Sequence, residues 1–273
     1  MKPSKFSYPS FWLVLAIVLV VMGTNATLKY LSGLGKNNSA ESEISLHAEQ
    51  IGLQLSDYPK EIVDLFKYNE ETRDFVLDYP LKVVNFKPDS QDLVEHAKCT
   101  SPPILMQWDL KWGYMPYNGN VMGISGSAPT ALSMAALFVT HDTSLTPVRI
   151  AKLAHNMNAD DDTDKLLSEG ARSLSLEVKG VPKNDKRLRE AVAEEGAVVI
   201  CTTNGKKFSP VIVIRGFDDE NRFQLNDTIS EKRCKKAYNF ADLESSLKKC
   251  WKYTLPKKDE SQTQETESAE STP

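Results

Sequence analysis

Ser127 is the residue of this sequence best placed to take part in chemistry. It follows Gly126 and precedes an apolar run, residues 132–139, that predicts a buried helix. Ser127 suits a helix N-cap, and Pro129 suits the first turn because it lacks an N–H and fixes φ. A side chain at a helix N-terminus faces unpaired N–H groups and can carry a thiolate or meet an oxyanion. Ser127 is therefore either an ordinary helix cap or part of a reactive site.

Three further segments give Ser127 a context. Residues 107–114 read Gln-Trp-Asp-Leu-Lys-Trp-Gly-Tyr, residues 210–215 form an apolar strand pattern, and Asn226-Asp227 follows. Together they resemble the C39-like branch of the papain-like cysteine peptidases, over roughly residues 58–253. That family reads Gln-Trp-Asp-x-x-Trp-Gly-Tyr, Ser-Gly-Cys-Gly-Pro-Thr, Gly-His-Phe-Ile-Val and Asn-Asp-Pro. The positions kept here are Gln107, Trp108, Asp109, Trp112, Gly113, Tyr114, Ser125, Gly126, Pro129, Thr130, Gly216, Phe217, Asp219, Asn226 and Asp227.

The chain departs from the family at the positions that would do the chemistry. The family's nucleophilic cysteine falls on Ser127 and its neighbouring glycine on Ala128. Its general-base histidine falls on Pro210 or an adjacent position. The strand expected to carry the base contains none of the chain's four histidines, which are His47, His96, His141 and His155.

The remaining motif residues keep only the outline of a catalytic site. The resemblance implies that Gln107 is the oxyanion-hole glutamine and that Asn226 or Asp227 once oriented the histidine. A serine hydroxyl is too weak an acid for a helix dipole alone to ionise, so Ser127 needs a positioned base. Pro210 cannot supply one, and even Ser127→Cys alone should leave a poor catalyst. We interpret these five residues as a vestigial site, with no metal or cofactor expected.

Three hypotheses follow for the function. The first is a non-catalytic C39-like pseudopeptidase on the outer face of a bacterial membrane, binding a peptide or a surface protein through a degenerate cleft. The second is an active peptidase or other hydrolase in which Ser127 uses Asp227, Lys206 or Lys207 as its base. A lysine base needs desolvation, and the loop carrying both lysines is polar, which favours the first hypothesis. The third is a purely structural surface domain.

The N-terminus predicts a membrane segment. Two lysines precede the apolar block 11–22, which with the milder residues after it reaches about 18 residues, a marginal span. Positive charge before the block favours a cytoplasmic N-terminus with the rest of the chain outside. A single-pass anchor is favoured because Lys29 and Tyr30 suit an interface, and a signal peptide cleaved near residues 24–26 is the alternative. The folded part is then extracytoplasmic or secreted.

Composition divides the chain into five regions. Lys and Arg total 33 against 37 for Asp and Glu, and the net charge of -4 offers no basic footprint for nucleic acid. Residues 32–45 are rich in Gly, Ser, Asn and Lys and predict a flexible spacer. The expected regions are 1–31 anchor or signal, 32–57 linker, 58–98 helical segment, 99–256 C39-like domain and 257–273 disordered acidic tail.

The expected elements place helices mainly first and strands mainly last, which is typical of an α+β fold. A helical hairpin is expected from Tyr58 to Asp78, ended by Pro80. Further helices are expected over 147–156 with Thr146 as cap, 165–173, 185–194 and 240–250. Strands are expected over 176–181, 197–202, 210–214, 222–225 and 251–255. The resemblance implies a papain-like fold, with N-terminal helices packed on a mostly antiparallel sheet.

The four cysteines, Cys99, Cys201, Cys234 and Cys250, permit three complete pairings in an exported protein. Cys201 lies in an apolar strand and is expected to be a small core residue. Cys234 with Cys250 is the pair that we single out for testing, since the strand and helix between them could fold back together. Cys99 is not favoured as a substitute nucleophile, because no partner or helix start accompanies it.

The acidic run 160–164 invites a calcium interpretation but does not match the loop template. Lys165 stands where the turn glycine belongs, and Ala171 stands where the bidentate glutamate belongs. A solvated loop whose last residues cap the following helix is expected instead.

Overall fold

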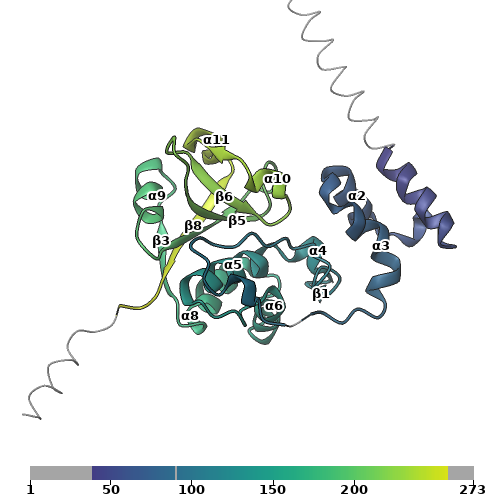
Figure 1. The fold of residues 1–273 in the computed structure, drawn as a ribbon, viewed down its shortest axis with the longest axis horizontal. Helices are drawn as coiled ribbons and strands as arrows, with labels where there is room; N and C mark the ends of the chain where they lie inside the picture. The colour runs from purple at the N-terminus through teal and green to yellow at the C-terminus, as the bar shows by residue number, and fades with distance from the viewer. Residues whose placement is uncertain (1–38, 90, 258–273) are drawn as a thin grey trace, which may run out of the picture. The chain divides into compact units, whose positions relative to one another are not determined.

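The structure is a computed structural model that describes residues 39–89 and 91–257. The chain divides into two compact units, Met1–Leu77 and Asp78–Pro273, coloured along the chain in Figure 1. This boundary falls inside the region 58–98 that the sequence suggested as one segment. The expected membrane segment and nearly all of the expected acidic tail lie outside the described residues.

The described part of the first unit is helical. Residues 39–50 form a helix in which Ala40, Ile44 and Ala48 are buried, so the expectation of a flexible spacer is wrong for 39–45. These residues recur every four positions, a helical spacing that the polar composition of the segment concealed. After η1 (Leu55–Asp57) come α2 (Lys60–Tyr68), η2 (Glu70–Thr72) and α3 (Arg73–Val83), which begins in this unit.

The expected helical pair is confirmed, with one correction at its end. α2 buries Ile62, Leu65 and Phe66 as their spacing predicted. α3, however, runs through Pro80 to Val83 instead of ending there. A proline removes a single helical hydrogen bond, and α3 continues for only three residues beyond it.

A six-stranded antiparallel sheet is the centre of the second unit, in the order β3-β8-β4-β5-β6-β7 (Figure 1). Antiparallel pairing is consistent along the sheet, so the α+β class is confirmed. A separate hairpin, β1–β2, precedes it. The strands are β1 (Pro116–Tyr117), β2 (Asn120–Val121), β3 (Glu177–Val181), β4 (Val198–Thr203), β5 (Val211–Phe217), β6 (Phe223–Asp227), β7 (Ala237–Tyr238) and β8 (Leu247–Thr254).

Helices cover both faces of this sheet. α5 (Ser127–Thr140) packs on one face and α6 (Pro147–Asn156) packs on α5. The expected helix 147–156 with its Thr146 cap is confirmed, since the Thr146 side chain accepts from Arg149 N. The other elements are η3 (Val94–His96), α4 (Met122–Ser125), α7 (Thr163–Lys165), the π-helical η4 (Leu166–Gly170), α8 (Ala171–Ser173), α9 (Asp185–Val192), α10 (Glu231–Cys234) and α11 (Phe240–Glu244).

Alternation along the strands separates two hydrophobic cores. Val198 and Ile200 of β4 lie in the core shared with α5, whereas Val199 and Cys201 lie in the opposite core. The second core is closed by apolar side chains of α9 and α11, such as Leu188. Because β4 is buried at every position, its sequence shows a continuous apolar run instead of alternation.

The C-terminal segment differs from the expectation of a helix over 240–250 and a strand over 251–255. α11 ends at Glu244, and β8 occupies Leu247–Thr254. β8 pairs with β3 on one side and β4 on the other, so sheet pairing outweighs the local helical pattern.

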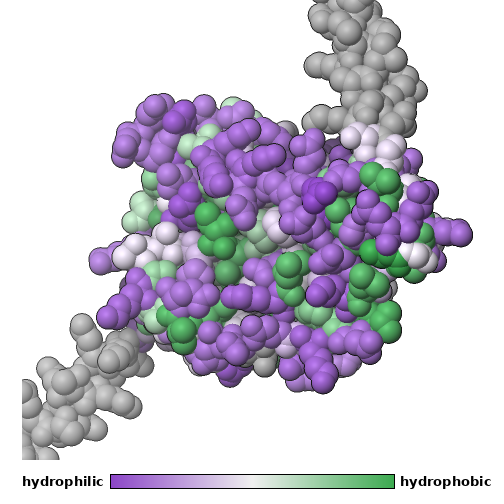
Figure 2. Space-filling view, turned by 45° about the vertical axis from the view of Figure 1, so that its right-hand side comes forward, coloured by the Kyte–Doolittle hydropathy of each residue, from purple (hydrophilic) through white to green (hydrophobic). Residues whose placement is uncertain are grey.

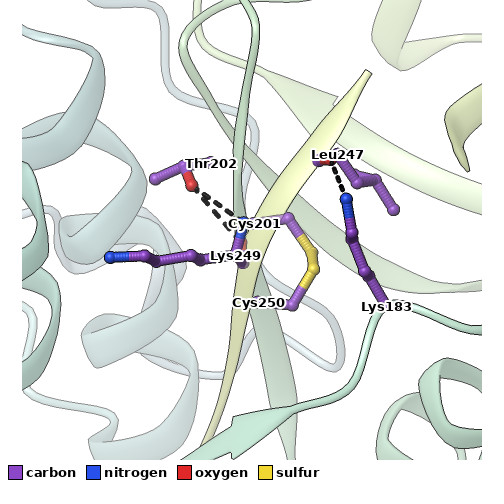
Figure 3. The surroundings of a disulfide bond; sticks show 6 residues. All are labelled: Lys183, Cys201, Thr202, Leu247, Lys249 and Cys250. Atoms are coloured by element: carbon purple, nitrogen blue, oxygen red, sulfur yellow. Dashed lines mark hydrogen bonds between the residues drawn. A yellow bond between two sulfur atoms is a disulfide. The ribbon is translucent and has the colours of Figure 1, made fainter. Parts of the chain in front are cut away.

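The disulfide joins Cys201 to Cys250, and the candidate Cys234–Cys250 bond is wrong (Figure 3). Cys201 and Cys250 face each other directly across β4 and β8, with Cα atoms 4.1 Å apart. Thr202 Oγ1 of β4 also accepts from Lys249 N of β8 (Figure 3). Cys234 instead stays a buried thiol, whose Sγ accepts from Asp227 N at 3.1 Å.

The face drawn in Figure 2 is mostly hydrophilic, with small separate hydrophobic patches. Large apolar side chains that are exposed among the described residues include Leu46, Tyr68, Leu81, Val84, Val94, Ile104, Leu110 and Leu255. Among residues 39–89 and 91–257, no helix has both the length and the apolar character needed to cross a membrane.

Candidate functional site

The N-terminal end of α5 is where the vestigial site was expected. α5 begins at Ser127, as predicted, but Gly126 holds the N-cap position and no side chain caps the helix. A Cβ at position 126 would collide with the backbone oxygen of Met122, so the turn between α4 and α5 requires glycine. The cap assigned to Ser127 is therefore wrong: its side chain leaves the helix and bonds to the sheet.

The Ser127 hydroxyl belongs to a buried hydrogen-bond network. Val211 N donates to Ser127 Oγ at 3.0 Å, and Ser127 Oγ lies 3.0 Å from Thr228 Oγ1. Thr228 Oγ1 in turn donates to Gln107 Oε1 at 2.9 Å, and Gln107 Nε2 donates to the carbonyls of Gly123 and Ile124. The network thus joins α5, the start of β5, the residue after β6 and the segment before the β1–β2 hairpin.

The order of donors along this network fixes the role of each hydroxyl. Thr228 gives its hydrogen to Gln107, so in the contact with Ser127 it accepts; the Ser127 hydrogen is directed to Thr228 Oγ1 at 3.0 Å, with Val211 O at 3.3 Å as a second acceptor. Ser127 Oγ also accepts from Val211 N. Ser127 is 4 % exposed, and its hydroxyl is held by neutral groups of Thr228 and Val211, none of which can remove its proton.

Ser209 extends the same network along the edge of the sheet. Its hydroxyl donates to Val211 O at 2.7 Å and accepts from Thr228 N at 3.3 Å. Thr228 O accepts from Gln107 N at 2.8 Å. Backbone and side-chain groups around Ser127 are therefore used in mutual hydrogen bonds, which is the pattern of a structural polar core.

Asn226 and Asp227 lie on opposite faces of β6. Asn226 pairs with Val213 on the α5 face, where its Nδ2 donates to the carbonyls of Pro102 and Pro103. Its Oδ1 is buried without a hydrogen-bond partner among the described residues. Asn226 therefore anchors the segment before Gln107, and none of the side-chain partners that it has among the described residues is titratable.

The Asp227 carboxylate is directed away from Ser127. It is fully buried and forms an ion pair with Arg233 at 2.7 Å. It also accepts from the backbone N–H groups of Ser209, Ile229 and Ser230. A carboxylate with this many donors stabilises the turn after β6, and its position does not support the role of base for Ser127.

The other residues proposed for the base position are also not arranged to take the proton of Ser127. Pro210 is exposed, and its carbonyl accepts from Thr203 N at 2.8 Å. Lys206 is exposed, and Lys207 Nζ donates to Asp242 O and lies 5.9 Å from the Tyr238 ring centroid. Tyr238 belongs to the core on the opposite face of the sheet from α5. The structure thus brings Gln107 and Ser127 together. None of the side chains proposed as a base forms a hydrogen bond with Ser127 among the described residues.

Two titratable groups of the second unit, Tyr238 and Cys99, have pKa values shifted toward their neutral forms. Burial, with a contribution from Asp227, raises the pKa of Tyr238 to about 12. Burial also raises the pKa of the Cys99 thiol, which disfavours the thiolate that a substitute nucleophile would need. Among the described residues, no group of three or more His, Cys, Asp or Glu side chains could hold a metal ion.

A second candidate site was not recognised from the sequence. A cavity of about 910 Å³ lies beside the β1–β2 hairpin, lined by Tyr117 and Asn118 of the hairpin, by His155 of α6, and by Asp160 and Asp161 of the following loop. The hairpin turn has φ values of 48° at Asn118 and 68° at Gly119. Asn-Gly is the usual sequence for such a turn, so this dipeptide was the signal that could have located the hairpin.

The cavity contains a hydrogen-bonded pair of ionisable side chains. His155 Nδ1 lies 3.0 Å from Asp160 Oδ2, and the His155 side chain is 80 % exposed. Asp162 caps α7 by accepting from Lys165 N, and Asp164 forms an ion pair with Lys249. The expected capping role of the acidic run is therefore confirmed for Asp162, while Asp160 and Asp161 face the cavity.

In comparisons with protein-family models, with curated proteins and with solved structures, the chain has no match. The resemblance to C39-like peptidases stays a prediction from the motifs.

Proposed function

We propose that this chain is a non-catalytic relative of the C39-like peptidases that binds a peptide or a surface protein outside the cytoplasm of a bacterium. The observation that carries the proposal is the state of Ser127. Its hydroxyl is buried and donates to Thr228, and the carboxylate proposed as its base is paired with Arg233 on the other face of β6. Serine without a base is a poor nucleophile.

The papain-like fold is part of this proposal and is supported by the order of contacts. In that fold the nucleophile begins a helix that packs against the strand carrying the base. Here Ser127 begins α5 and bonds to Val211 at the start of β5, one residue after the predicted base position. Gln107 lies next to the same point, as the resemblance implies, although it presents Oε1 to Thr228 and its Nε2 donates to the carbonyls of Gly123 and Ile124.

The extracytoplasmic location is supported by the disulfide. Cys201 and Cys250 are bonded, and such bonds persist mainly in oxidising compartments. The apolar block 11–22 in the sequence adds the possibility of a membrane anchor. The proposal keeps both forms of attachment, an uncleaved anchor or secretion after cleavage.

One part of the hypothesis changes in this proposal: the ligand is not expected to bind in a degenerate cleft at Ser127. Gln107 and Thr228 are fully buried, and Ser127 is nearly so. A ligand could not reach these three side chains without breaking their mutual hydrogen bonds. The binding surface is therefore better sought in the cavity beside the hairpin than at the former catalytic position.

The experiment that tests the proposal looks for hydrolysis. The full-length chain, kept in a mild detergent because of its apolar N-terminal block, would be incubated with a diverse peptide library and analysed by mass spectrometry. Ser127→Ala is the control. We expect no cleavage by either protein; cleavage by the wild type that disappears in Ser127→Ala would overturn the proposal and support a serine hydrolase.

A second measurement avoids the possibility that Ser127→Ala is simply less stable. A fluorophosphonate probe labels serines that have been activated as nucleophiles. We expect no label on Ser127 in the folded wild-type chain, because its proton is shared with Thr228 and no base is present. Specific labelling at Ser127 would contradict the non-catalytic assignment without any variant.

A further inference from the structure

The cavity beside the β1–β2 hairpin has the chemistry of a binding site, unlike the closed network at Ser127. From its lining we infer that it binds a basic side chain of an extended peptide, with an arginine guanidinium held by Tyr117, Asp160 and Asp161. This inference rests on the proposed function and names the kind of ligand that the domain would recognise. Its volume of about 910 Å³ suits a short peptide segment.

The first observation is a hydroxyl that opens into the cavity and has no partner among the described residues. Tyr117 is 6 % exposed and lines the cavity, yet its hydroxyl has no hydrogen bond within residues 39–89 and 91–257. Other buried tyrosines behave differently: Tyr253 donates to Leu167 O at 2.8 Å, and Tyr58 donates to Leu77 O at 2.9 Å. The Tyr117 side chain is thus held in place by its buried ring, and its hydroxyl is available to a ligand group in the cavity.

The second observation is the charge near that hydroxyl. Burial, together with the carboxylates of Asp160 and Asp161, raises the pKa of Tyr117 above its ordinary value. Asp161 has no ion pair or side-chain hydrogen bond among the described residues, and Asp160 uses one oxygen for His155. The phenol and two carboxylates therefore present acceptors to whatever occupies the cavity.

The balance of charge in the lining favours a cation. Lys152 carries the permanent positive charge of the described lining, against two carboxylates, and it has no ion pair with either of them within 4 Å. A guanidinium offers five N–H donors in a planar fork and is weakly hydrated, so it suits two carboxylates and a phenol better than an ammonium does.

The remaining lining suits the backbone of a peptide. Asn118 and Asn120 extend from the hairpin, and Asn156 and Asn158 extend from α6 and the residues after it. Side-chain amides donate and accept hydrogen bonds, as peptide N–H and C=O groups require. Met115 and Ala151 supply apolar contact on either side. The cavity therefore combines one charge-selective pocket with amides that are indifferent to peptide sequence.

The test compares two peptides of nearly the same shape, one with the charged guanidinium and one with a neutral urea group that has fewer N–H donors. Calorimetric titration of the full-length chain would use acetyl-Gly-Gly-Arg-Gly-Gly-amide and the same peptide with citrulline, which keeps the shape of arginine without its charge. We expect the arginine peptide to bind at least about tenfold more tightly. Equal affinities, or no binding of the arginine peptide at millimolar concentration, would overturn the inference.

Matched variants then locate the binding. Asp161→Asn and Tyr117→Phe should each weaken the binding of the arginine peptide by about tenfold or more, since the first removes a negative charge and the second removes an acceptor. Asp164→Asn is the control, because Asp164 lies three residues further along and pairs with Lys249 outside the cavity. Unchanged affinity in Asp161→Asn, or equal losses in Asp161→Asn and Asp164→Asn, would place the binding elsewhere.

The same samples separate this inference from the proposed function. Mass spectrometry of the titrated peptides would reveal any hydrolysis. Ser127-dependent cleavage would overturn the non-catalytic function whatever the affinity. Intact peptides with no preference for arginine would overturn the cavity inference alone.

Discussion

The end of α5 and the cavity beside the β1–β2 hairpin contain similar residue types in opposite states. At α5, the side chains of Ser127, Thr228 and Gln107 are buried and hydrogen-bonded to one another. In the cavity, the ring of Tyr117 is buried and the carboxylate of Asp161 is exposed, and neither the Tyr117 hydroxyl nor that carboxylate has a protein partner among the described residues. The first arrangement stabilises the fold, whereas the second is available to a ligand.

This difference teaches that family motifs and binding capacity need not lie at the same place. In the proposed relationship to the C39-like peptidases, replacement of a catalytic cysteine and histidine leaves polar groups that must find other partners, because buried polar atoms without hydrogen bonds are costly. Thr228 and Val211 are those partners for Ser127. Each prediction below measures whether a residue contributes to stability, to binding, or to both.

The largest expected effect comes from the disulfide, which belongs to neither region. Replacing both Cys201 and Cys250 by alanine opens a loop of 49 residues. The loss of unfolding free energy should be about 4 kcal/mol, from the chain entropy that the bond removes from the unfolded state. Urea unfolding checks the value. Under conditions in which the variant is folded, it should still bind the arginine peptide. Loss of binding by the folded variant would mean that the disulfide contributes to binding as well as to stability.

Gln107→Leu should have the next largest effect. The substitution keeps the approximate volume but leaves the carbonyls of Gly123 and Ile124 without their side-chain donor, and the Thr228 hydroxyl without its acceptor. We expect a loss of about 3 kcal/mol in urea unfolding, because several buried groups become unsatisfied together. The affinity for the arginine peptide should not change. A stability loss below about 1 kcal/mol would contradict the network as described.

Local sequence patterns predicted much of the fold, and their failures have physical causes. The predicted bounds of the helix Pro147–Asn156 were correct, because the Thr146 cap, Pro147 in the first turn and the apolar spacing all indicate the same helix. The helix expected over 240–250 fails because pairing of β8 with β3 and β4 is a contact over long sequence separation. The disulfide prediction failed for the same reason, since the register that places Cys201 opposite Cys250 cannot be read from the sequence of β4 or of β8 alone.

The candidate site was predictable only in part. The motif located Gln107 and Ser127, which the structure joins through Thr228. It did not indicate Thr228 as the joining residue, because its role depends on the register of β5 with β6. Nor did it separate Asn226 from Asp227, although adjacent strand residues point to opposite faces. The cavity was missed because Tyr117 and Asp161 are distant in sequence.

Ser127→Ala tests the α5 network at its centre. The change removes the acceptor for Val211 N and the donor to Thr228 Oγ1, both in buried positions. We expect a loss of about 2 kcal/mol in unfolding free energy. Ser127→Cys should be destabilised less, since a thiol keeps weak hydrogen bonds. If Ser127→Ala had the same unfolding free energy as the wild type, the α5 network would not stabilise the fold as described, and Ser127 would need another role.

The smallest effect compares two buried tyrosines, Tyr253 and Tyr117. Tyr253→Phe loses the hydrogen bond to Leu167 O and should cost about 1 kcal/mol at neutral pH. Tyr117→Phe should change the stability by less than about 0.5 kcal/mol, because its hydroxyl has no protein partner to lose. Urea unfolding of both variants beside the wild type measures the difference.

Measuring the unfolding free energy at alkaline pH tests the comparison of Tyr117 with Tyr253 further. Burial raises the pKa of both phenols in the folded state, so each favours the fold in its protonated form. That contribution is complete below the unfolded pKa of about 10 and is lost as the pH rises toward the folded value. Each Phe variant should therefore lose less stability above pH 10 than the wild type does, although only Tyr253→Phe is weaker at neutral pH. A loss at neutral pH in Tyr117→Phe as large as that in Tyr253→Phe would mean that its hydroxyl is satisfied within the fold, and the cavity would have no unpartnered group for a ligand.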